Sequence, residues 1–295
     1  MRYHNLLFIF ALLACPAINL NAAPGGKDTL SKTIRMIQRG ENDSLRFVAN
    51  QFLTDTFYKI ISIDSSFSAS FTEFSNISIL MDADKRIRIC TWTVPNFDGE
   101  HYSYFGFLQI RDEKKNVFRS IPLNDSSSTL LKPESEKLTP DRWLGAVYYT
   151  LIPVEQKNKT YYTLLGWKGK NKKVTQKVIE ILSVEKNTIR FGMPVIKMGS
   201  VYKSRVIYSY NSEASMALRY EKNNSRIVAD HIIGTNNKDT DDSTPFLNGP
   251  DGSYDGFYLS KNKWIFSADV DVHTGAKKPK NIPAPIKDSE MRKSD

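Results

Sequence analysis

The chain has 295 residues, of which 40% are hydrophobic and 12% aromatic, and its formal net charge is +9 at pH 7. The apolar content excludes a disordered chain, because it is enough to build a core, and the length fits one large domain or two small ones. The positive charge favours acidic partners, among them anionic lipids, acidic polysaccharides and nucleic acids, and does not choose among them. The sequence has no nucleotide-binding motif, so a nucleic acid is not expected.

The first residues are typical of a secretory signal peptide. Arg2 precedes the apolar run from Leu6 to Leu13, and the small residues Ala22 and Ala23 offer a cleavage site. The run is too short for a transmembrane helix, which needs about 20 apolar residues. We therefore predict a signal peptide at residues 1–22 and an exported protein, located in the periplasm, at the outer membrane or at the cell surface.

A lipid anchor is the alternative outcome of export. Leu12-Leu13-Ala14-Cys15 looks like the lipobox at which bacterial lipoproteins are cleaved and acylated on the cysteine. Leu13 is bulkier than the residue usually found there, so we favour ordinary cleavage and keep an anchor at Cys15 as the alternative. Cleavage near Ala22 leaves only Cys90, which excludes an internal disulfide. Cys90 lies in a predicted strand, where we expect a buried structural thiol rather than a nucleophile.

Residues 23–62 are expected to form a flexible lead and an N-terminal helix. The lead is Ala23-Pro24-Gly25-Gly26, and the helix is predicted over Asp43 to Tyr58, with Asn42 or Asp43 as its N-cap. The apolar residues at helical spacing are Leu45, Val48, Ala49, Phe52, Leu53 and Phe57. This stripe predicts that the helix packs on the main domain.

Residues 63–273 are expected to form an antiparallel β domain. Short runs rich in Ile, Val, Tyr, Phe and Thr alternate with Gly, Asn, Asp and Lys, a pattern typical of strands joined by tight turns. The predicted strands are Ile77 to Met81, Arg86 to Val94, Tyr102 to Arg111, Trp143 to Pro153, Tyr161 to Trp167, Lys177 to Val184, Val201 to Tyr210, Met216 to Glu221, Ile227 to Ile233 and Trp264 to Val272.

Alternation within these strands suggests the architecture. Arg86 to Ile89, and less cleanly Arg205 to Tyr208, alternate polar and apolar residues, which predicts one wet and one buried face. The stretches that begin at His101 and Lys159 share an aromatic strand, a charged turn and a returning strand. The fold class is therefore all-β with mainly antiparallel sheets, propeller-like or a sandwich, and a short N-terminal helix.

Three polar segments are predicted outside the strands. Asn124 to Pro140 is rich in Ser, Pro and Glu and is expected to be a surface loop between two halves of the sheets. Thr235 to Asn248 is a second polar loop. Residues 274–295 are rich in Lys and Pro with almost no large apolar side chain, which predicts a disordered basic tail.

Asp251, Ser253 and Asp255 are the candidate metal ligands. They stand at alternate positions before Gly256, as in the first half of a calcium loop, where side-chain oxygens converge on one hard cation. The twelfth position would be Asn262, where such a loop normally has a bidentate Glu. The same residues are a strong turn signal without any metal. We expect a turn, keep calcium as the alternative, and expect no other cofactor.

Asp230 and His231 are the candidate catalytic residues. They lie at the end of a predicted strand, so the imidazole is expected near the rim of a sheet, oriented by a neighbouring carboxylate as a general base is. A histidine at a strand end is more often a hydrogen-bonded structural residue, and this interpretation stays open. The sequence contains neither a GxSxG elbow nor an HExxH helix.

A run of one aromatic residue and four lysines is the candidate ligand-binding site. Its residues are Trp167, Lys168, Lys170, Lys172 and Lys173. An aromatic ring stacks on a sugar or a base, and ammonium groups pair with a phosphate or a carboxylate. Charged hairpin tips also occur because exposed edges must stay soluble, so we expect a solvated tip and keep the ligand-binding site as the alternative.

Several stretches after the signal carry a resemblance to other proteins. They are DADKRIRICTW from Asp82, WLGAVYY from Trp143, YTLLGWKGK from Tyr162, KVIEIL from Lys177, RVIYSY from Arg205, MALRYE from Met216, IVADHI from Ile227 and PDGSYDGF from Pro250. Together they resemble a family of uncharacterised exported proteins of Bacteroidetes bacteria. The resemblance implies an envelope or secreted location, and it implies no mechanism, because that family has no assigned activity.

These observations favour a non-enzymatic cell-envelope protein that binds an envelope polysaccharide or a protein partner through aromatic and basic residues. The alternative is a hydrolase that acts on an envelope glycan or peptide, with Asp230 and His231 at its centre. A structural component of a surface assembly is a third interpretation. Convergence of carboxylates with His231 in one pocket would favour the hydrolase.

Overall fold

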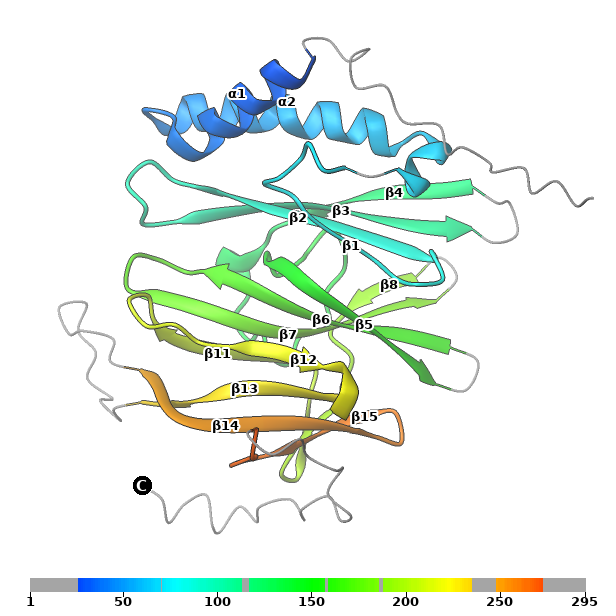
Figure 1. Cartoon of the computed structure of the whole chain (residues 1–295), viewed down its shortest axis with the longest axis vertical. Coiled ribbons are helices and arrows are strands. Elements are labelled where there is room, and N and C mark those ends of the chain that lie inside the picture. The colour runs from blue at the N-terminus through cyan, green and yellow to red at the C-terminus, as the bar shows by residue number, and fades with distance from the viewer. Residues whose placement is uncertain are drawn as a thin grey trace, which may run out of the picture.

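The computed structural model describes residues 26–69, 71–112, 117–156, 159–185, 188–234 and 248–272. Over these residues, two helices cover one face of a stack of three β-sheets (Figure 1). The predicted signal peptide with Cys15, nearly all of the predicted loop from Thr235 and the predicted tail at 274–295 lie outside the described residues. None of the described helices is long and apolar enough to cross a membrane.

The helical layer consists of α1 (Gly26–Arg39) and α2 (Asp43–Ile61). The predicted helix is confirmed as α2, and Asn42 is its N-cap, because its side chain accepts a hydrogen bond from the Leu45 N–H at 2.9 Å. α1 was not predicted. Its first residue, Gly26, had been assigned to the flexible lead, although Leu30, Ile34 and Ile37 recur at helical spacing and join the core below.

The buried face of α2 differs from the predicted stripe. Leu53 and Phe57 are buried, whereas Leu45, Val48 and Phe52 are at least two-fifths exposed, with Val48 the most exposed at 70%. The buried face instead includes Arg46 and Asn50. The prediction was wrong for these three exposed residues because it assumed that every apolar residue at helical spacing packs on the main domain.

Both polar residues are buried because each has a partner on the first sheet. The Asn50 side-chain oxygen accepts a hydrogen bond from Trp92 Nε1 at 2.7 Å. The Arg46 guanidinium donates to the carbonyls of Gly40, Pro95 and Asn96 at 2.9 to 3.0 Å. Paired polar groups can be buried at little cost, so these contacts fix the rotation of α2 against the sheet.

The first sheet is antiparallel, in the order β1-β2-β3-β4. Its strands are β1 (Ser78–Met81), β2 (Ile87–Pro95), β3 (Tyr102–Asp112) and β4 (Val117–Asn124). Successive residues face opposite layers: Cys90 and Phe107 pack under the helices, and Ile89 and Leu108 pack against the next sheet. Burial raises the pKa of the Cys90 thiol to about 12, so the expectation of a buried thiol is confirmed.

The middle sheet is covered on both faces. Its strands are β5 (Val147–Gln156), β6 (Lys159–Gly169), β7 (Val174–Glu185), β8 (Thr188–Phe191) and β11 (Arg205–Asn211), in the order β11-β7-β6-β5, with β8 paired to β7. Leu164 and Val178 belong to the core shared with the first sheet, whereas Leu165 and Ile179 belong to the core shared with the third. This double burial explains the unbroken apolar runs in β6 and β7.

The prediction of a wet face for β2 and β11 was wrong. Arg88 in β2 is 1% exposed, and its guanidinium lies over the rings of Phe67 and Phe71, with centroid distances of 4.9 and 4.7 Å. Phe67 lies in a short 3-10 helix, η2 (Asp64–Ser68). Arg205 in β11 is fully buried and pairs with Glu180 at 2.7 Å. The two arginines create the polar-apolar alternation in the sequence, although both faces of each sheet are covered and both side chains are buried.

The third sheet has the order β10-β9-β15-β14-β13-β12. Its strands are β9 (Ile196–Met198), β10 (Val201–Lys203), β12 (Leu218–Glu221), β13 (Arg226–Ile233), β14 (Gly249–Ser260) and β15 (Lys263–Ser267). The β15–β9 pair is parallel, and every other strand pair in the described residues is antiparallel. The Trp264 indole donates to Thr163 Oγ1 at 2.8 Å and so joins this sheet to the middle one.

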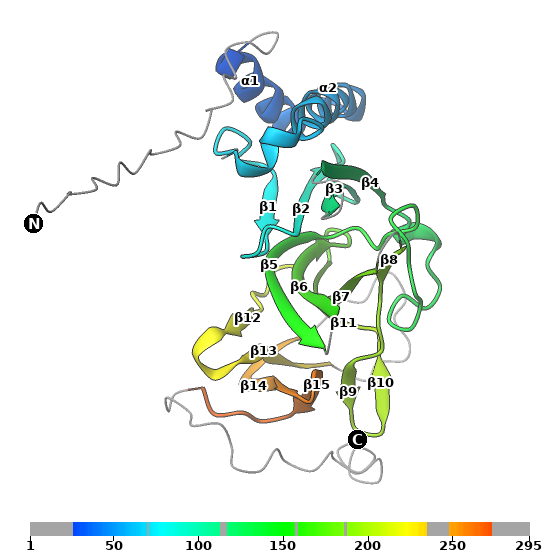
Figure 2. The same cartoon turned by 90° about the vertical axis from the view of Figure 1, so that its right-hand side faces the viewer.

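The predicted fold class is confirmed as mainly antiparallel β with an N-terminal helical segment. The sheets lie face to face, as in a sandwich extended by one layer, rather than around a central axis as in a propeller (Figures 1 and 2). The segment from Asn124 to Pro140 runs along the side of the stack and includes the 3-10 helix η3 (Ser127–Thr129) (Figure 2). A further short 3-10 helix, η4 (Lys222–Asn224), joins β12 to β13.

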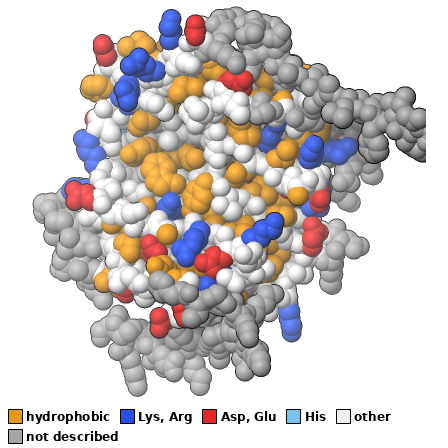
Figure 3. Space-filling model, in the orientation of Figure 1, with side chains coloured by type: hydrophobic (Ala, Val, Ile, Leu, Met, Phe, Trp, Pro, Cys, Tyr) orange, Lys and Arg blue, Asp and Glu red, His pale blue; other side chains and the backbone are white. Residues whose placement is uncertain are grey.

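Charge is dispersed over the face seen in Figure 3. Lysine and arginine side chains there alternate with aspartate and glutamate side chains and with exposed apolar groups (Figure 3). Several ion pairs are of this surface kind, including Lys159 with Glu185 at 2.9 Å and Arg142 with Glu136 at 2.7 Å. The positive net charge of the chain is therefore not gathered into one block on this face.

Candidate functional site

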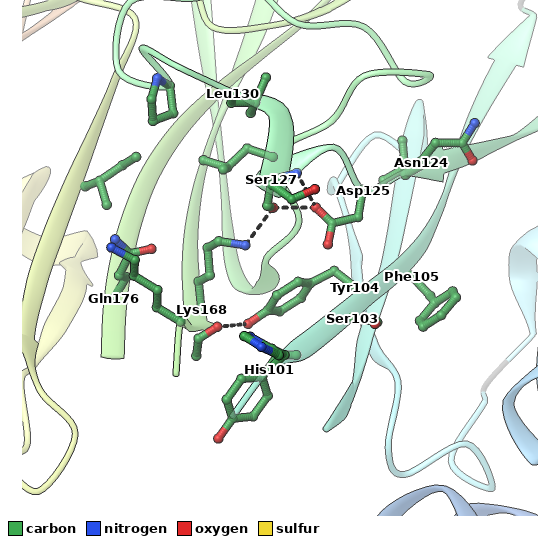
Figure 4. A pocket seen from close by; sticks show the side chains of 18 residues that line it. His101, Ser103, Tyr104, Phe105, Asn124, Asp125, Ser127, Leu130, Lys168 and Gln176 are labelled. Carbon is green, nitrogen blue, oxygen red and sulfur yellow. Dashed lines mark hydrogen bonds between the residues drawn. The ribbon is translucent and has the colours of Figure 1, made fainter. Parts of the chain in front are cut away.

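A cavity of about 830 Å³ opens between the first and middle sheets. Its wall combines β3, the end of β4, the segment that follows β4, the ends of β6 and β7, and β11. Polar side chains on this wall include His101, Asn124, Asp125, Ser127, Lys168 and Gln176 (Figure 4). Cavities that bind small ligands fall in this size range and combine apolar walls with a few convergent polar groups, so this cavity is the candidate site.

Lys168 is the buried cation of the cavity. It lies near the end of β6 and is 7% exposed, and its Nζ donates to Ser127 Oγ at 2.7 Å and to the Gly145 carbonyl at 2.8 Å. The same Nζ lies 4.1 Å from the centre of the Tyr104 ring (Figure 4). Burial lowers the pKa of Lys168 from 10.5 to about 8, and the negative charge of Asp125 opposes this shift.

Asp125 holds the segment that carries Ser127. Its Oδ1 accepts hydrogen bonds from the Ser127 N–H at 2.9 Å, from the Ser127 hydroxyl and from the Gly145 N–H at 3.1 Å. An aspartate that binds the amide two residues later makes the backbone turn sharply, which points the Ser127 side chain toward Lys168. Asp125, Ser127 and Lys168 therefore form one continuous series of hydrogen bonds (Figure 4).

Gly145 is required by the close packing at this point. A Cβ there would lie 2.5 Å from the Tyr104 Cβ and 2.6 Å from the Asp125 carboxylate. Tyr104 in turn donates its hydroxyl hydrogen to the Gly169 carbonyl at 2.8 Å, which fixes the ring under the Lys168 ammonium group. The glycine thus lets two chain segments approach closely enough for one lysine to bind both.

A buried ion pair positions the opposite wall. Arg205 binds Glu180 through Nε, and its Nη1 donates to the Pro133 carbonyl and to the Glu136 carbonyl, the latter at 2.9 Å. Lys203 adds an ion pair with Glu134 at 3.1 Å. The middle sheet therefore holds the segment after β4 by its backbone carbonyls, which keeps this largely irregular segment folded against the cavity.

The structure places the residues of the predicted aromatic and basic run in different surroundings. Lys168 is buried and Lys170 is exposed, and both line the cavity. Trp167 is half-buried and meets the ring of Tyr102, a cavity residue, edge-to-face at a centroid distance of 5.6 Å. The prediction of a solvated tip was wrong for Lys168, because β6 continues through Gly169 and turns this side chain inward.

The other two lysines of the run are placed outside the cavity. Lys172 pairs with Glu100 at 2.9 Å, and both side chains are about half exposed. Lys173 is exposed in the turn between β6 and β7, where its N–H donates to the Asn171 side chain at 2.9 Å. Of the predicted lysines, only Lys170 therefore offers an exposed charge at the cavity.

The structure places Asp230 and His231 against different partners. The Asp230 carboxylate accepts a hydrogen bond from the Ala217 N–H at 2.7 Å, whereas His231 Nδ1 lies 3.1 Å from the Asp255 carboxylate. The carboxylate that orients the imidazole is thus Asp255 on β14, and Asp230 has a structural contact. Burial raises the pKa of Asp255, and the hydrogen bond and charge of His231 oppose that shift. The nearby Tyr208 hydroxyl is buried and finds no hydrogen-bond partner within the described chain.

The predicted calcium loop is a strand. Asp251, Ser253 and Asp255 all lie in β14, and Asp251 Oδ1 is occupied by the Ser253 N–H at 2.9 Å and the Ser253 hydroxyl at 2.7 Å. Asp255 contacts His231 instead of converging with the other two. In the parts of the chain that the structure describes, no three His, Cys, Asp or Glu side chains are grouped to hold a metal ion. The turn that we preferred survives only as an irregularity within this strand, where the register with β13 shifts and Gly252 has a φ of 92°.

Sequence reasoning missed Asp125, Ser127 and Gly145. Lys168 and Ser127 are 41 positions apart, and no short motif relates them. The only local signal is the Asp-Ser-Ser sequence directly after a returning strand, which is typical of a tight turn and gives no hint of a buried amine.

Comparison with known proteins identifies no function for the chain, so the function is argued from this geometry. The predicted relation to exported Bacteroidetes proteins stays a prediction. A search against protein-family models, curated proteins and solved structures finds no match for the chain.

Proposed function

We propose that the protein is an exported binding module that holds a short segment of an acidic envelope polysaccharide at the cavity between β3 and β6. The observation that carries the proposal is the cavity of about 830 Å³ with an exposed lysine and an aromatic pair at its edge. Export and the envelope location come from the signal-peptide pattern. A protein partner remains the alternative occupant.

The chemistry of the edge favours a sugar polymer with negative groups. Tyr102 and Trp167 present aromatic surface, and the apolar faces of sugar rings pack on such surfaces. Lys170 adds an exposed positive charge beside them, whereas the charge of Lys172 is balanced by Glu100. A carboxylate or phosphate on the polymer would therefore be held at Lys170, while an uncharged part enters the cavity.

A hydrolase centred on Asp230 and His231 has less support. The Asp230 carboxylate binds the backbone at Ala217, and the cavity is lined by neither residue. The His231–Asp255 pair is a hydrogen-bonded histidine of the kind that also serves a purely structural purpose. The binding module is therefore the function that we propose for the cavity.

Cosedimentation with isolated cell-wall and outer-envelope polysaccharide tests the proposal. We expect the purified chain to be retained, and Lys170→Glu to weaken retention roughly fivefold, since reversing one exposed charge changes such a contact by about 1 kcal/mol. Lys222→Glu makes the same charge change at an exposed residue of η4, outside the cavity, and should bind as the wild type does. Equal retention of all three proteins would show that the charge at the cavity has no part in binding.

A further inference from the structure

The binding function leaves the buried amine of Lys168 unexplained. A lysine usually keeps its ammonium group in water, because removing a charge from water is costly. Lys168 lies in the cavity wall, and a nucleophile-type side chain, the Ser127 hydroxyl, is 2.7 Å from its Nζ. Both side chains reach the cavity, so a ligand atom can approach the hydroxyl (Figure 4).

The hydrogen bonds of Lys168 are satisfied in both of its protonation states. The charged amine has three hydrogens, and it has three acceptors: the Gly145 carbonyl, Ser127 Oγ and the face of the Tyr104 ring. The neutral amine has two hydrogens and a lone pair. The two hydrogens suffice for Gly145 and Tyr104, and the lone pair then points at Ser127 Oγ.

Ser127 can follow this change without moving its oxygen. Its hydroxyl hydrogen points to Asp125 when Lys168 is charged and rotates to Nζ when Lys168 is neutral. Asp125 then keeps the amide hydrogens of Ser127 and Gly145, so its carboxylate is not left bare. The site is thus built to exchange one proton between Ser127 and Lys168.

We propose that Ser127 is a nucleophile for carboxylic esters and that Lys168 is its general base. The ester group would be carried by the polymer, and this part of the inference rests on the proposed binding function. The attack on the ester itself depends only on Ser127, Lys168 and the cavity. A serine activated by a lysine amine is a known chemical alternative to a serine activated by histidine.

The reaction balances with water as the only co-reactant. Neutral Lys168 takes the proton of Ser127 as Oγ bonds to the carbonyl carbon, whose π electron pair moves to the carbonyl oxygen. That pair then re-forms the carbonyl and breaks the bond to the ester oxygen, which leaves with the proton of Lys168. Water repeats the two steps on the acylated Ser127 and releases a carboxylic acid, while Lys168 returns the proton to Ser127.

The charge balance of the cavity favours an uncharged reacting group. An anion beside Lys168 would favour its protonated form and so remove the base, whereas an ester carbonyl brings no charge. Any negative group of the polymer would instead lie toward the exposed Lys170. Asp125 already supplies the one carboxylate in the hydrogen-bond series of Ser127 and Lys168.

Acetylation by p-nitrophenyl acetate, followed by peptide mapping in a mass spectrometer, tests the inference on the full chain. We expect one acetyl group on Ser127, formed about tenfold faster at pH 9 than at pH 7, because the neutral fraction of a group with a pKa of about 8 rises by that factor. Ser127→Ala should lose this adduct and supplies the correction for spontaneous hydrolysis. Ser126→Ala removes the neighbouring hydroxyl, outside the cavity wall, and should react as the wild type does.

Two variants of Lys168 separate a base from a structural cation. Lys168→Arg keeps a charge and hydrogen-bond donors but cannot become neutral, and Lys168→Met removes the amine. Either variant that keeps the wild-type circular dichroism spectrum should fail to acetylate Ser127. Acetylation of Ser127 at the wild-type rate in such a variant would overturn the inference. So would a wild type that at pH 9 shows neither a Ser127 adduct nor release of p-nitrophenol above that of Ser127→Ala.

The outcome is independent of polysaccharide binding. The small ester carries no polymer, so its reaction with Ser127 does not require retention of the polysaccharide, and Lys222→Glu, outside the cavity, should leave both measurements unchanged. Retention on polysaccharide with neither a Ser127 adduct nor Ser127-dependent release of p-nitrophenol would refute the nucleophile and leave the binding module. A Ser127 adduct without retention would refute the polymer and leave the nucleophile.

Discussion

Replacing Lys168 with methionine tests the electrostatics of the cavity. Methionine is unbranched and of similar length, so it fills the same space without the amine. Burial lowers the pKa of Lys168 from 10.5 to about 8 in the folded protein, whereas the unfolded chain keeps the ordinary value. Between these values the unfolded chain holds a proton that the folded protein has lost. The stability linked to Lys168 is therefore present at high pH and is lost as the pH falls through the folded pKa.

The size of the effect follows from the two pKa values. Each pKa unit corresponds to about 1.4 kcal/mol, so the whole effect is about 3 kcal/mol, of which about 2 kcal/mol falls between pH 7 and pH 9.5. We expect the free energy of unfolding of the wild type to rise by about 2 kcal/mol relative to that of Lys168→Met between pH 7 and pH 9.5. Burial also raises the pKa of the Tyr104 hydroxyl, so this hydroxyl stays protonated in both folded proteins. Its contribution therefore cancels in the comparison.

Urea denaturation of both proteins at several pH values in this interval provides the free energies of unfolding. Ionisation of tyrosines in the unfolded chain is common to the two proteins and is removed by subtraction. Lys168→Met also loses the hydrogen bonds to Ser127 and Gly145, which shifts its free energy of unfolding by the same amount at every pH. The pH dependence of the difference between the two proteins therefore isolates the ionisation of Lys168. Parallel stability curves would refute the reasoning, because they would place the folded pKa of Lys168 near 10.5.

Two further substitutions probe the other buried charges. Arg205→Met leaves the Glu180 carboxylate buried without its guanidinium, which should cost about 3–5 kcal/mol in urea denaturation, and addition of Glu180→Gln should recover part of it. An unchanged stability would contradict this account. Burial raises the pKa of Asp255 above 3.8, so the wild type should lose stability relative to Asp255→Asn as the pH rises from 3.8 through the folded pKa. Melting temperatures that run in parallel over that range would contradict it.

The elements that could be predicted are those whose signal is local. Asn42 before the apolar residues of α2 marks the helix start, and the aromatic and β-branched runs of β2, β3, β6 and β7 mark strands. β14 was mistaken for a turn because Gly249, Pro250 and Gly252 are turn residues. Pairing with β13 at Gly249 and Pro250, and again from Tyr254 onward, extends the chain on both sides of Gly252, and this pairing overrides the local preference.

The candidate site depends on contacts that no local pattern contains. Lys168 follows Trp167 in a run of charged residues, which is the ordinary signature of a solvated turn. Its burial requires that the segment around Ser127 return over the end of β6, and that Gly145 permit the approach. Likewise, the carboxylate beside His231 was expected from the adjacent Asp230 and comes instead from Asp255 on the neighbouring strand. Sequence proximity is a poor guide wherever sheet pairing decides the neighbours.

The parallel pairing of β15 with β9 has a consequence for the order of folding. The first and middle sheets are built largely from successive hairpins, so most of their contacts join residues close in sequence and can form early. The β15–β9 pair instead joins Trp264 to Ile196, and the Trp264 ring also enters the core between the middle and third sheets. Loop-closure entropy delays such a contact until the intervening hairpins exist. The third sheet is therefore completed from the C-terminal side, and a chain that ends before β15 retains its hairpins but lacks the tryptophan that joins the last two layers.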